Sequence, residues 1–78
     1  MNKQRREAIE RAEALLREAQ EILEGARDDE QDYFDNMPDN IHDGDKGSAV
    51  EGNIQCLEEA CGLIAEVCDT HIPGAIEQ

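Results

Sequence analysis

The sequence has few of the residues that build a large core or an enclosed site. Its 78 residues include no tryptophan, one tyrosine and one phenylalanine. No apolar run approaches the ~20 residues that a membrane-spanning helix needs. Residues 1–16 alternate charged and short apolar side chains, unlike the continuous apolar segment of a signal peptide. We therefore expect one domain over residues 1–78, cytoplasmic and without contact to a membrane.

Basic residues are also scarce, and they are unevenly placed. Seven Lys and Arg stand against 20 Asp and Glu, which gives a net charge of −13. Residues 1–27 hold six basic and six acidic side chains, whereas residues 28–78 hold fourteen acidic ones and a single base, Lys46. Such a surface repels nucleic acid and anionic membranes and attracts basic protein surfaces. We expect a protein partner and no direct binding to nucleic acid.

Three cysteines lie within thirteen residues of one predicted helix. Cys61 and Cys68 are about 10 Å apart along that helix, beyond the reach of a disulfide. We expect Cys56, Cys61 and Cys68 to be reduced and buried as small apolar side chains. Cys68 and His71 offer two zinc ligands one turn apart, but structural zinc takes four, so we predict no metal site.

Apolar periodicity predicts two helices and no strand. The first covers about residues 3–35, where apolar residues recur at steps of three and four. The packing stripe is formed by Ile9, Ala12, Leu16, Ala19, Leu23 and Ala26, and it is widened by Ala8, Leu15 and Ile22. Two alternatives remain open at Gly25: a continuous helix that bends there, or a helix that stops there.

Pro38 and several turn-forming residues predict a corner over residues 36–47. The second helix covers about residues 48–68, and either Asp43 or Ser48 can cap it. Its heptad seam consists of Val50, Ile54, Leu57, Cys61, Ile64 and Cys68. Pro73 and Gly74 predict that the helix breaks, with a loose tail over residues 69–78.

Together these elements predict an all-α fold, a two-helix antiparallel hairpin. A hairpin alone leaves Leu15, Ile22, Leu63 and Val67 exposed to water. The simplest way to bury them is a homodimer that forms a four-helix bundle. A foreign partner is the alternative.

The acidic corner does not match a known catalytic or calcium-binding pattern. A calcium loop that starts at Asp43 would place Gly47 and Ile54 at ligand positions, and a start at Asp39 fails in the same way. No nucleophile can be placed beside His42. We expect no enzymatic activity, no cofactor and no metal.

Residues 28–45 carry eight carboxylates and no Lys or Arg. Helical side chains about 5–6 Å apart resemble the phosphate spacing of a nucleic-acid strand, although the same charge also serves solubility. The candidate partner-binding residues are Asp28, Asp29, Glu30, Asp32, Tyr33, Phe34, Asp35, Asp39, Asp43 and Asp45. Tyr33, Phe34 and Met37 have a second interpretation, an apolar plug that closes the end of the helix pair.

The stretch 28–64, DDEQDYFDNMPDNIHDGDKGSAVEGNIQCLEEACGLI, resembles small acidic helical proteins of phages and mobile elements. The specific parts are the corner Asp35-Asn36-Met37-Pro38 and the later Leu57-Glu58-Glu59-Ala60. The chain departs from that pattern at Asp39, where Glu is usual, and at 43–47, where a Ser-Glu-Arg-Gly-like cap is usual. The resemblance implies a helical hairpin of phage-like origin and no particular activity.

Two hypotheses follow for the function. In the first, the protein is a non-enzymatic, phage-type inhibitor that occupies a basic nucleic-acid-binding surface of a host protein, as an anti-CRISPR or other anti-defence protein does. In the second, it is a structural or assembly module that acts through helix pairing, and its charge serves solubility. Salt weakens a charge-driven contact and hardly affects an apolar one, so salt dependence separates the two.

Overall fold

A computed structural model describes residues 1–77 of the chain. Its helices are α1 (Lys3–Asp35), α2 (Asp39–His42), α3 (Asp45–Glu66), the π-helix η1 (Val67–His71) and α4 (Ile72–Glu77). These residues contain no strand, so the prediction of an all-α fold is confirmed. The described helices include none with the length and apolar composition of a membrane-spanning segment.

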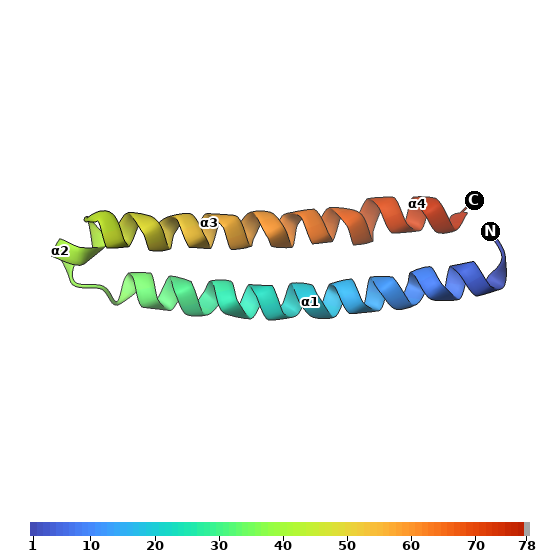
Figure 1. Cartoon of the computed structure of the whole chain (residues 1–78), viewed down its shortest axis with the longest axis horizontal. Coiled ribbons are helices and arrows are strands. Elements are labelled where there is room, and N and C mark those ends of the chain that lie inside the picture. The colour runs from blue at the N-terminus through green and yellow to red at the C-terminus, as the bar shows by residue number, and fades with distance from the viewer. Residues whose placement is uncertain (78) are drawn as a thin grey trace.

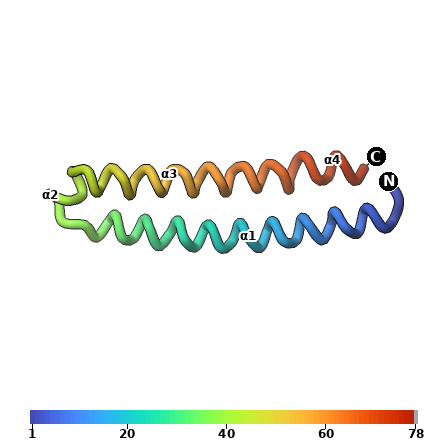
Figure 2. The backbone as a smooth tube through the Cα atoms, viewed as in Figure 1, coloured from blue at the N-terminus to red at the C-terminus, as the bar shows by residue number. Residues whose placement is uncertain are grey.

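The helices form a long, thin rod. α1 makes one arm and runs antiparallel to the second arm, which consists of α3, η1 and α4 (Figure 1). The short α2 lies at the turn between the arms, and the start of α1 lies beside α4 at the opposite end of the rod (Figure 2). The backbone measures 58 × 15 × 12 Å. The rod therefore has a corner end and a terminal end.

α1 is one continuous helix. Its first turn is capped by Asn2, whose side-chain oxygen accepts the backbone N–H of Arg5 at 2.9 Å. The helix continues through Gly25, where a Cβ atom would meet nothing within 4 Å, so the stop that the sequence left open does not occur. At the other end the Asn36 side chain donates to the carbonyl of Asp32 at 2.7 Å. Pro38 follows and directs the chain into the corner.

The side of α1 that packs on α3 differs from the predicted stripe. Ala12 and Ala26 are exposed, although the periodicity placed them in the interface. Long polar side chains take their place, because they can cover apolar neighbours with their stems while their polar ends reach water or a backbone group. Gln20, for example, donates from its amide to the carbonyl of Cys61 at 3.4 Å. The half-buried inner row is Ile9, Glu13, Leu16, Gln20, Leu23, Arg27, Glu30 and Phe34.

The core is small and comes from the second arm. Val50, Ile54, Cys61, Cys68 and Ile72 are buried, whereas none of residues 3–35 in α1 is. Burying a Val or Ile side chain contributes about 1.5–3 kcal/mol. Since only a few such side chains are buried, each one matters to the stability of the helix pair.

The corner contains more helix than the sequence predicted. Residues 39–42 form the single turn α2, and α3 begins at Asp45 rather than near residue 48. Gly44, which has no side chain, occupies the N-cap position of α3. Neither Asp43 nor Ser48 therefore caps the helix. A four-residue helix is too short to show a periodicity, which is why sequence reasoning missed it.

The prediction of a loose tail over residues 69–78 is also wrong for the described residues 69–77. The chain continues as the π-helix η1 and then as α4, and Gln78 lies outside the described residues. The wide π turn keeps Cys68, Ile72 and Ile76, four residues apart each time, on the side facing α1. Pro73 is the second residue of α4, and its missing N–H falls next to the π turn, where the regular α-helical hydrogen-bond pattern is already interrupted.

A second row of apolar residues on α1 stays in water. Leu15 is 56% exposed and Ile22 is 67% exposed, the latter more than any other large apolar side chain of the described residues. We call this the outer row. It consists of Ala8, Ala12, Leu15, Ala19, Ile22, Ala26 and Tyr33, of which only Ala19 is half-buried. The helix pair therefore leaves uncovered the flanking apolar residues that the sequence singled out on α1.

Candidate interaction surface

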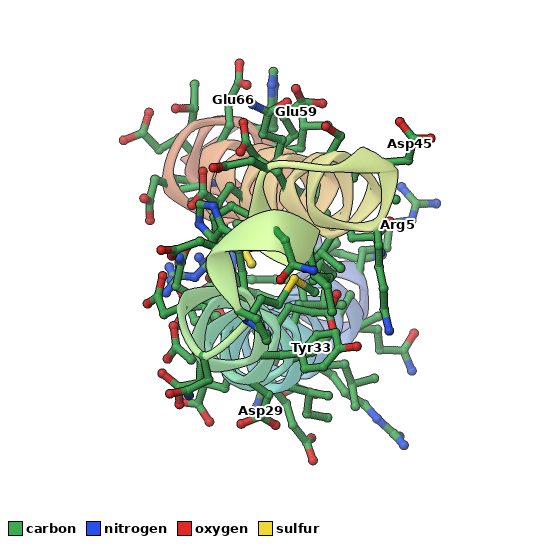
Figure 3. The ribbon with its side chains drawn as sticks, turned by 90° about the vertical axis from the view of Figure 1, so that its left-hand side faces the viewer. Arg5, Asp29, Tyr33, Asp45, Glu59 and Glu66 are labelled. Atoms are coloured by element: carbon green, nitrogen blue, oxygen red, sulfur yellow. The ribbon has the colours of Figure 1, made fainter. Side chains whose placement is uncertain are left out.

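The acidic residues gather at the corner end of the rod. The last turns of α1, the α2 turn and the first turn of α3 meet there, and Figure 3 looks onto this end. We call the carboxylates of residues 28–45 the acidic end. Seven of the eight are exposed, namely Asp28, Asp29, Asp32, Asp35, Asp39, Asp43 and Asp45. Seven of the eight predicted carboxylates therefore face water, and the eighth, Glu30, is half-buried.

Few groups neutralise this charge. Asp28 accepts hydrogen bonds from Arg27, the shorter at 3.0 Å, and Asp35 accepts one from the Gln31 amide at 2.9 Å. The hydrogen bond to Asp28 raises the pKa of Arg27 above its ordinary value. Asp29 and Asp32 make no ion pair and no side-chain hydrogen bond with any residue of 1–77. The acidic end therefore keeps most of its negative potential.

Backbone dipoles favour two of the carboxylates at their positions. Asp39 lies in the first turn of α2 and Asp45 in the first turn of α3. The positive end of a helix stabilises a nearby negative charge. These two acids support the corner as well as adding to its charge, so they are poor sites for testing the charge alone.

The aromatic residues of the corner have separate roles. Phe34 is half-buried and lies against the His42 ring, with 4.0 Å between the ring centroids. Met37 is half-buried beside this turn, so Phe34 and Met37 face the interior as a plug would. Tyr33 is 46% exposed, so the plug interpretation is wrong for this residue. Among the residues predicted to contact a partner, Phe34 and Glu30 are half-buried and Tyr33 is exposed.

Gly47 lets α3 start directly against α2. A Cβ atom at this position would collide with the carbonyl of His42 and lie 2.9 Å from the carbonyl oxygen of Ile41. Both neighbours are backbone atoms, so no side chain could move aside. The sequence suggested a turn glycine here, but the need for close backbone contact became visible only in the structure.

The terminal end of α1 carries the opposite charge, which sequence reasoning passed over. Lys3, Arg5, Arg6 and Arg11 are exposed, and none of them forms an ion pair with another residue of 1–77. Arg17, farther along the helix, does have partners at Asp69 and Glu13. Hydrogen bonds to these two carboxylates raise the pKa of Arg17 above its ordinary value.

The cysteines and the second histidine differ in burial. Cys61 and Cys68 are buried and Cys56 is exposed, so the prediction that all three are buried is wrong for Cys56. Cys68 faces α1, whereas His71 is exposed and has Glu66 as its neighbour, 3.8 Å from Nε2. Within the described part of the chain, no three His, Cys, Asp or Glu side chains are placed to hold a metal ion, and no pocket is present.

No protein-family model matches this chain, and no curated protein or solved structure is significantly similar to it.

Proposed function

We propose that the protein is a non-enzymatic interaction protein whose acidic end binds a basic protein surface. The observation that carries this proposal is the separation of charge along the chain, between the mixed charges of residues 1–27 and the carboxylates of residues 28–45. Eight carboxylates without a Lys or Arg occupy residues 28–45, and seven of them are exposed at one end of a 58 Å rod. A partner with Lys and Arg side chains would find a high local negative potential there.

Solubility alone does not account for this arrangement. Mixed charges serve solubility as well as clustered ones, and the first half of α1 shows such a mixture. Clustered like charges repel one another and cost stability. Clustered charge that costs stability is better explained by a function that needs the carboxylates close together, such as binding to a basic partner.

The spacing of the carboxylates favours a partner that normally binds nucleic acid. Asp28, Asp32 and Asp35 follow one another at steps of four and three along α1, with side chains about 5–6 Å apart. This spacing is comparable to that of phosphates along a strand. The proposed partner is therefore a basic nucleic-acid-binding surface of a host protein.

The resemblance to phage proteins indicates the kind of host protein and the kind of inhibition to expect. We infer a phage-type inhibitor in the host cytoplasm, of the anti-CRISPR or other anti-defence kind. The hairpin expected from the sequence, acting as a homodimer, is part of the same proposal, and it would present the acidic end twice.

A second candidate function rests on the uncovered apolar residues. Leu15 and Ile22 remain more than half exposed on α1, and Leu63 is 63% exposed on α3. A structural or assembly module would use such side chains for helix pairing, with its charge only for solubility. The two functions differ in the residues they need.

Affinity capture from a bacterial lysate tests the main proposal. The triple variant Asp28→Asn, Asp32→Asn, Asp35→Asn removes charge from the acidic end and leaves the outer row unchanged. A matched control, Glu18→Gln, Glu21→Gln, Glu59→Gln, removes the same charge from exposed positions elsewhere. Wild type and control should retain a nucleic-acid-binding protein that duplex DNA elutes, and the triple variant should lose it.

Salt provides the second readout. Between about 0.1 M and about 1 M salt the screening length falls from about 10 Å to about 3 Å, so charge-driven capture should disappear. Capture that persists at high salt, or that is equal for the triple variant and wild type, would contradict the proposal. It would favour the assembly module instead.

A further inference from the structure

The outer row of α1 continues at both ends into charged residues. Arg5 precedes Ala8 by one turn, and Asp29 lies between Ala26 and Tyr33 in the same sequence of three- and four-residue steps. The row is therefore basic at its start, apolar in the middle and acidic near its end. Its two large aliphatic side chains, Leu15 and Ile22, lie at nearly equal distances on either side of Ala19.

A matching row follows α3 on the same side of the helix pair. The contact between Tyr33 and Lys46 establishes this, because the Lys46 Nζ lies 5.7 Å from the centre of the Tyr33 ring. From Lys46 the α3 row continues at the same steps through Ala49, Asn53, Cys56, Ala60, Leu63 and Val67. Figure 3 shows Tyr33 and Arg5, from opposite ends of the outer row, pointing to the same side of the rod.

The exposed aliphatic side chains of both helices lie at the same level of the rod. The hydrogen bond from Gln20 to the Cys61 carbonyl fixes the level at which α1 and α3 face each other. Leu15 and Ile22 flank this level on α1, and Leu63 lies two residues from it on α3. Leu15, Ile22 and Leu63 therefore form one apolar centre on a single face of the pair.

We propose that a second copy of this chain docks on this face, with α1 against α1 and α3 against α3, each pair antiparallel. The two-fold axis then passes close to Ala19 and Leu63. This arrangement brings Leu15 opposite Ile22 of the second copy, because their positions mirror each other about Ala19. Ala19 lies between them, and Ala12 and Ala26 flank them in the row, so short side chains let the two helix backbones approach closely. The inference specifies the face and register of the homodimer named under the proposed function, and it rests on that part of the proposal.

Charge selects this direction over the parallel one. Residues 1–11 hold four basic side chains, none of which forms an ion pair with another residue of 1–77, and two acidic ones, whereas the last eight residues of α1 hold five acids and no base. Parallel docking would place the two acidic ends side by side. Antiparallel docking places the basic start of each α1 next to the acidic end of the other, with Arg5 close to Asp29 and Tyr33 of the second copy. Opposite potentials steer association and fix the register.

The rod is long enough for a stable dimer. The two longer extents of its backbone are 58 and 15 Å. A docking face that runs along the rod is comparable in size to the about 800 Å² that each partner buries in a usual specific interface. Asp28, Asp32 and Asp35 lie outside this face, so the dimer presents two acidic ends at opposite ends of the assembly.

Sedimentation equilibrium tests the face. Wild type should be a dimer, and Ile22→Gln and Leu63→Gln should each weaken dimerisation at least about tenfold, since each change removes two large apolar side chains from the centre. The matched control Ala14→Gln places the same side chain at an exposed α1 position off the outer row and should leave the dimer unchanged. A strict monomer, or a dimer that none of these changes affects, would overturn the inference.

Charge reversal tests the register. Arg5→Glu and Asp29→Lys should each weaken the dimer about fivefold, and the double variant should recover most of the loss. Within one chain the two residues are about 36 Å apart along α1, so only contact between copies can produce the recovery. Additive losses without recovery would overturn the antiparallel register. The triple Asp→Asn variant of the acidic end should still dimerise, so failure of the dimer and failure of partner binding can be told apart.

Discussion

Replacement of Gly47 by alanine tests the packing of the corner. The added Cβ atom would collide with the His42 carbonyl and lie 2.9 Å from the carbonyl oxygen of Ile41. Because both groups belong to the backbone of α2, the start of α3 must move away to make room. That movement would also disturb the nearby contact between Phe34 and His42.

Two opposing effects determine the size of the change. An extra methyl group forced into a packed site costs about 1–3 kcal/mol. Alanine in place of glycine stabilises a helix by about 0.5–1 kcal/mol. We therefore expect Gly47→Ala to lower the free energy of unfolding by about 1–2 kcal/mol. For a chain of this size the melting temperature falls by about 4–8 °C per kcal/mol.

Thermal unfolding followed by circular dichroism measures this change. Gly62→Ala is the matched control, because Gly62 lies in the same helix and a Cβ atom there meets nothing within 4 Å. The control should raise the free energy of unfolding by about 0.5–1 kcal/mol. All samples need the same protein concentration, since association makes the melting temperature concentration-dependent. If Gly47→Ala melts at or above wild type, the close contact between α2 and α3 is wrong.

The remaining predictions concern the core and the thiols. Ile54→Ala should lower the free energy of unfolding in urea by about 2–5 kcal/mol, and Leu57→Ala, at a half-buried position, by less; equal losses would contradict the burial pattern. In the Ile22→Gln variant, in which dimerisation is weakened, a thiol reagent should label the exposed Cys56 quickly and the buried Cys61 and Cys68 only as fast as the protein opens. Equal labelling rates for all three cysteines in that variant would contradict the fold.

The sequence predicts the helices better than their contacts. The length of α1 follows from good helix formers and an unbroken apolar periodicity. That periodicity does not say which side of a broad stripe faces α3, because Ala12 and Leu16 both belong to it. The structure turns Leu16 inward together with Gln20 and Arg27, since long polar side chains can pack along their stems.

Helix-stop residues in the sequence predicted the wrong end for the second helical arm. Pro73 and Gly74 are typical of a helix stop, and they predicted a loose tail. Two apolar residues, Ile72 and Ile76, lie just where a π turn can keep them facing α1. Packing against α1 outweighs the local preference, and a single sequence read for propensity does not reveal this.

The acidic surface was accessible to sequence reasoning for a simple reason. Eight carboxylates without a neighbouring Lys or Arg cannot all be buried or paired, so most of them must face water. The same reasoning could not separate Phe34 and Tyr33, which are adjacent in the chain. The contact of Phe34 with His42 depends on the α2 turn, which the sequence did not reveal.

The association rate of the protein with its captured partner tests the central claim most directly. If the acidic end carries binding, the rate constant for wild type should fall steeply between about 0.1 M and about 1 M salt. The variant Asp28→Asn, Asp32→Asn, Asp35→Asn should associate slowly at both salt concentrations, whereas the control Glu18→Gln, Glu21→Gln, Glu59→Gln should behave like wild type. Equal association rates for the variant and wild type at low salt would contradict the claim.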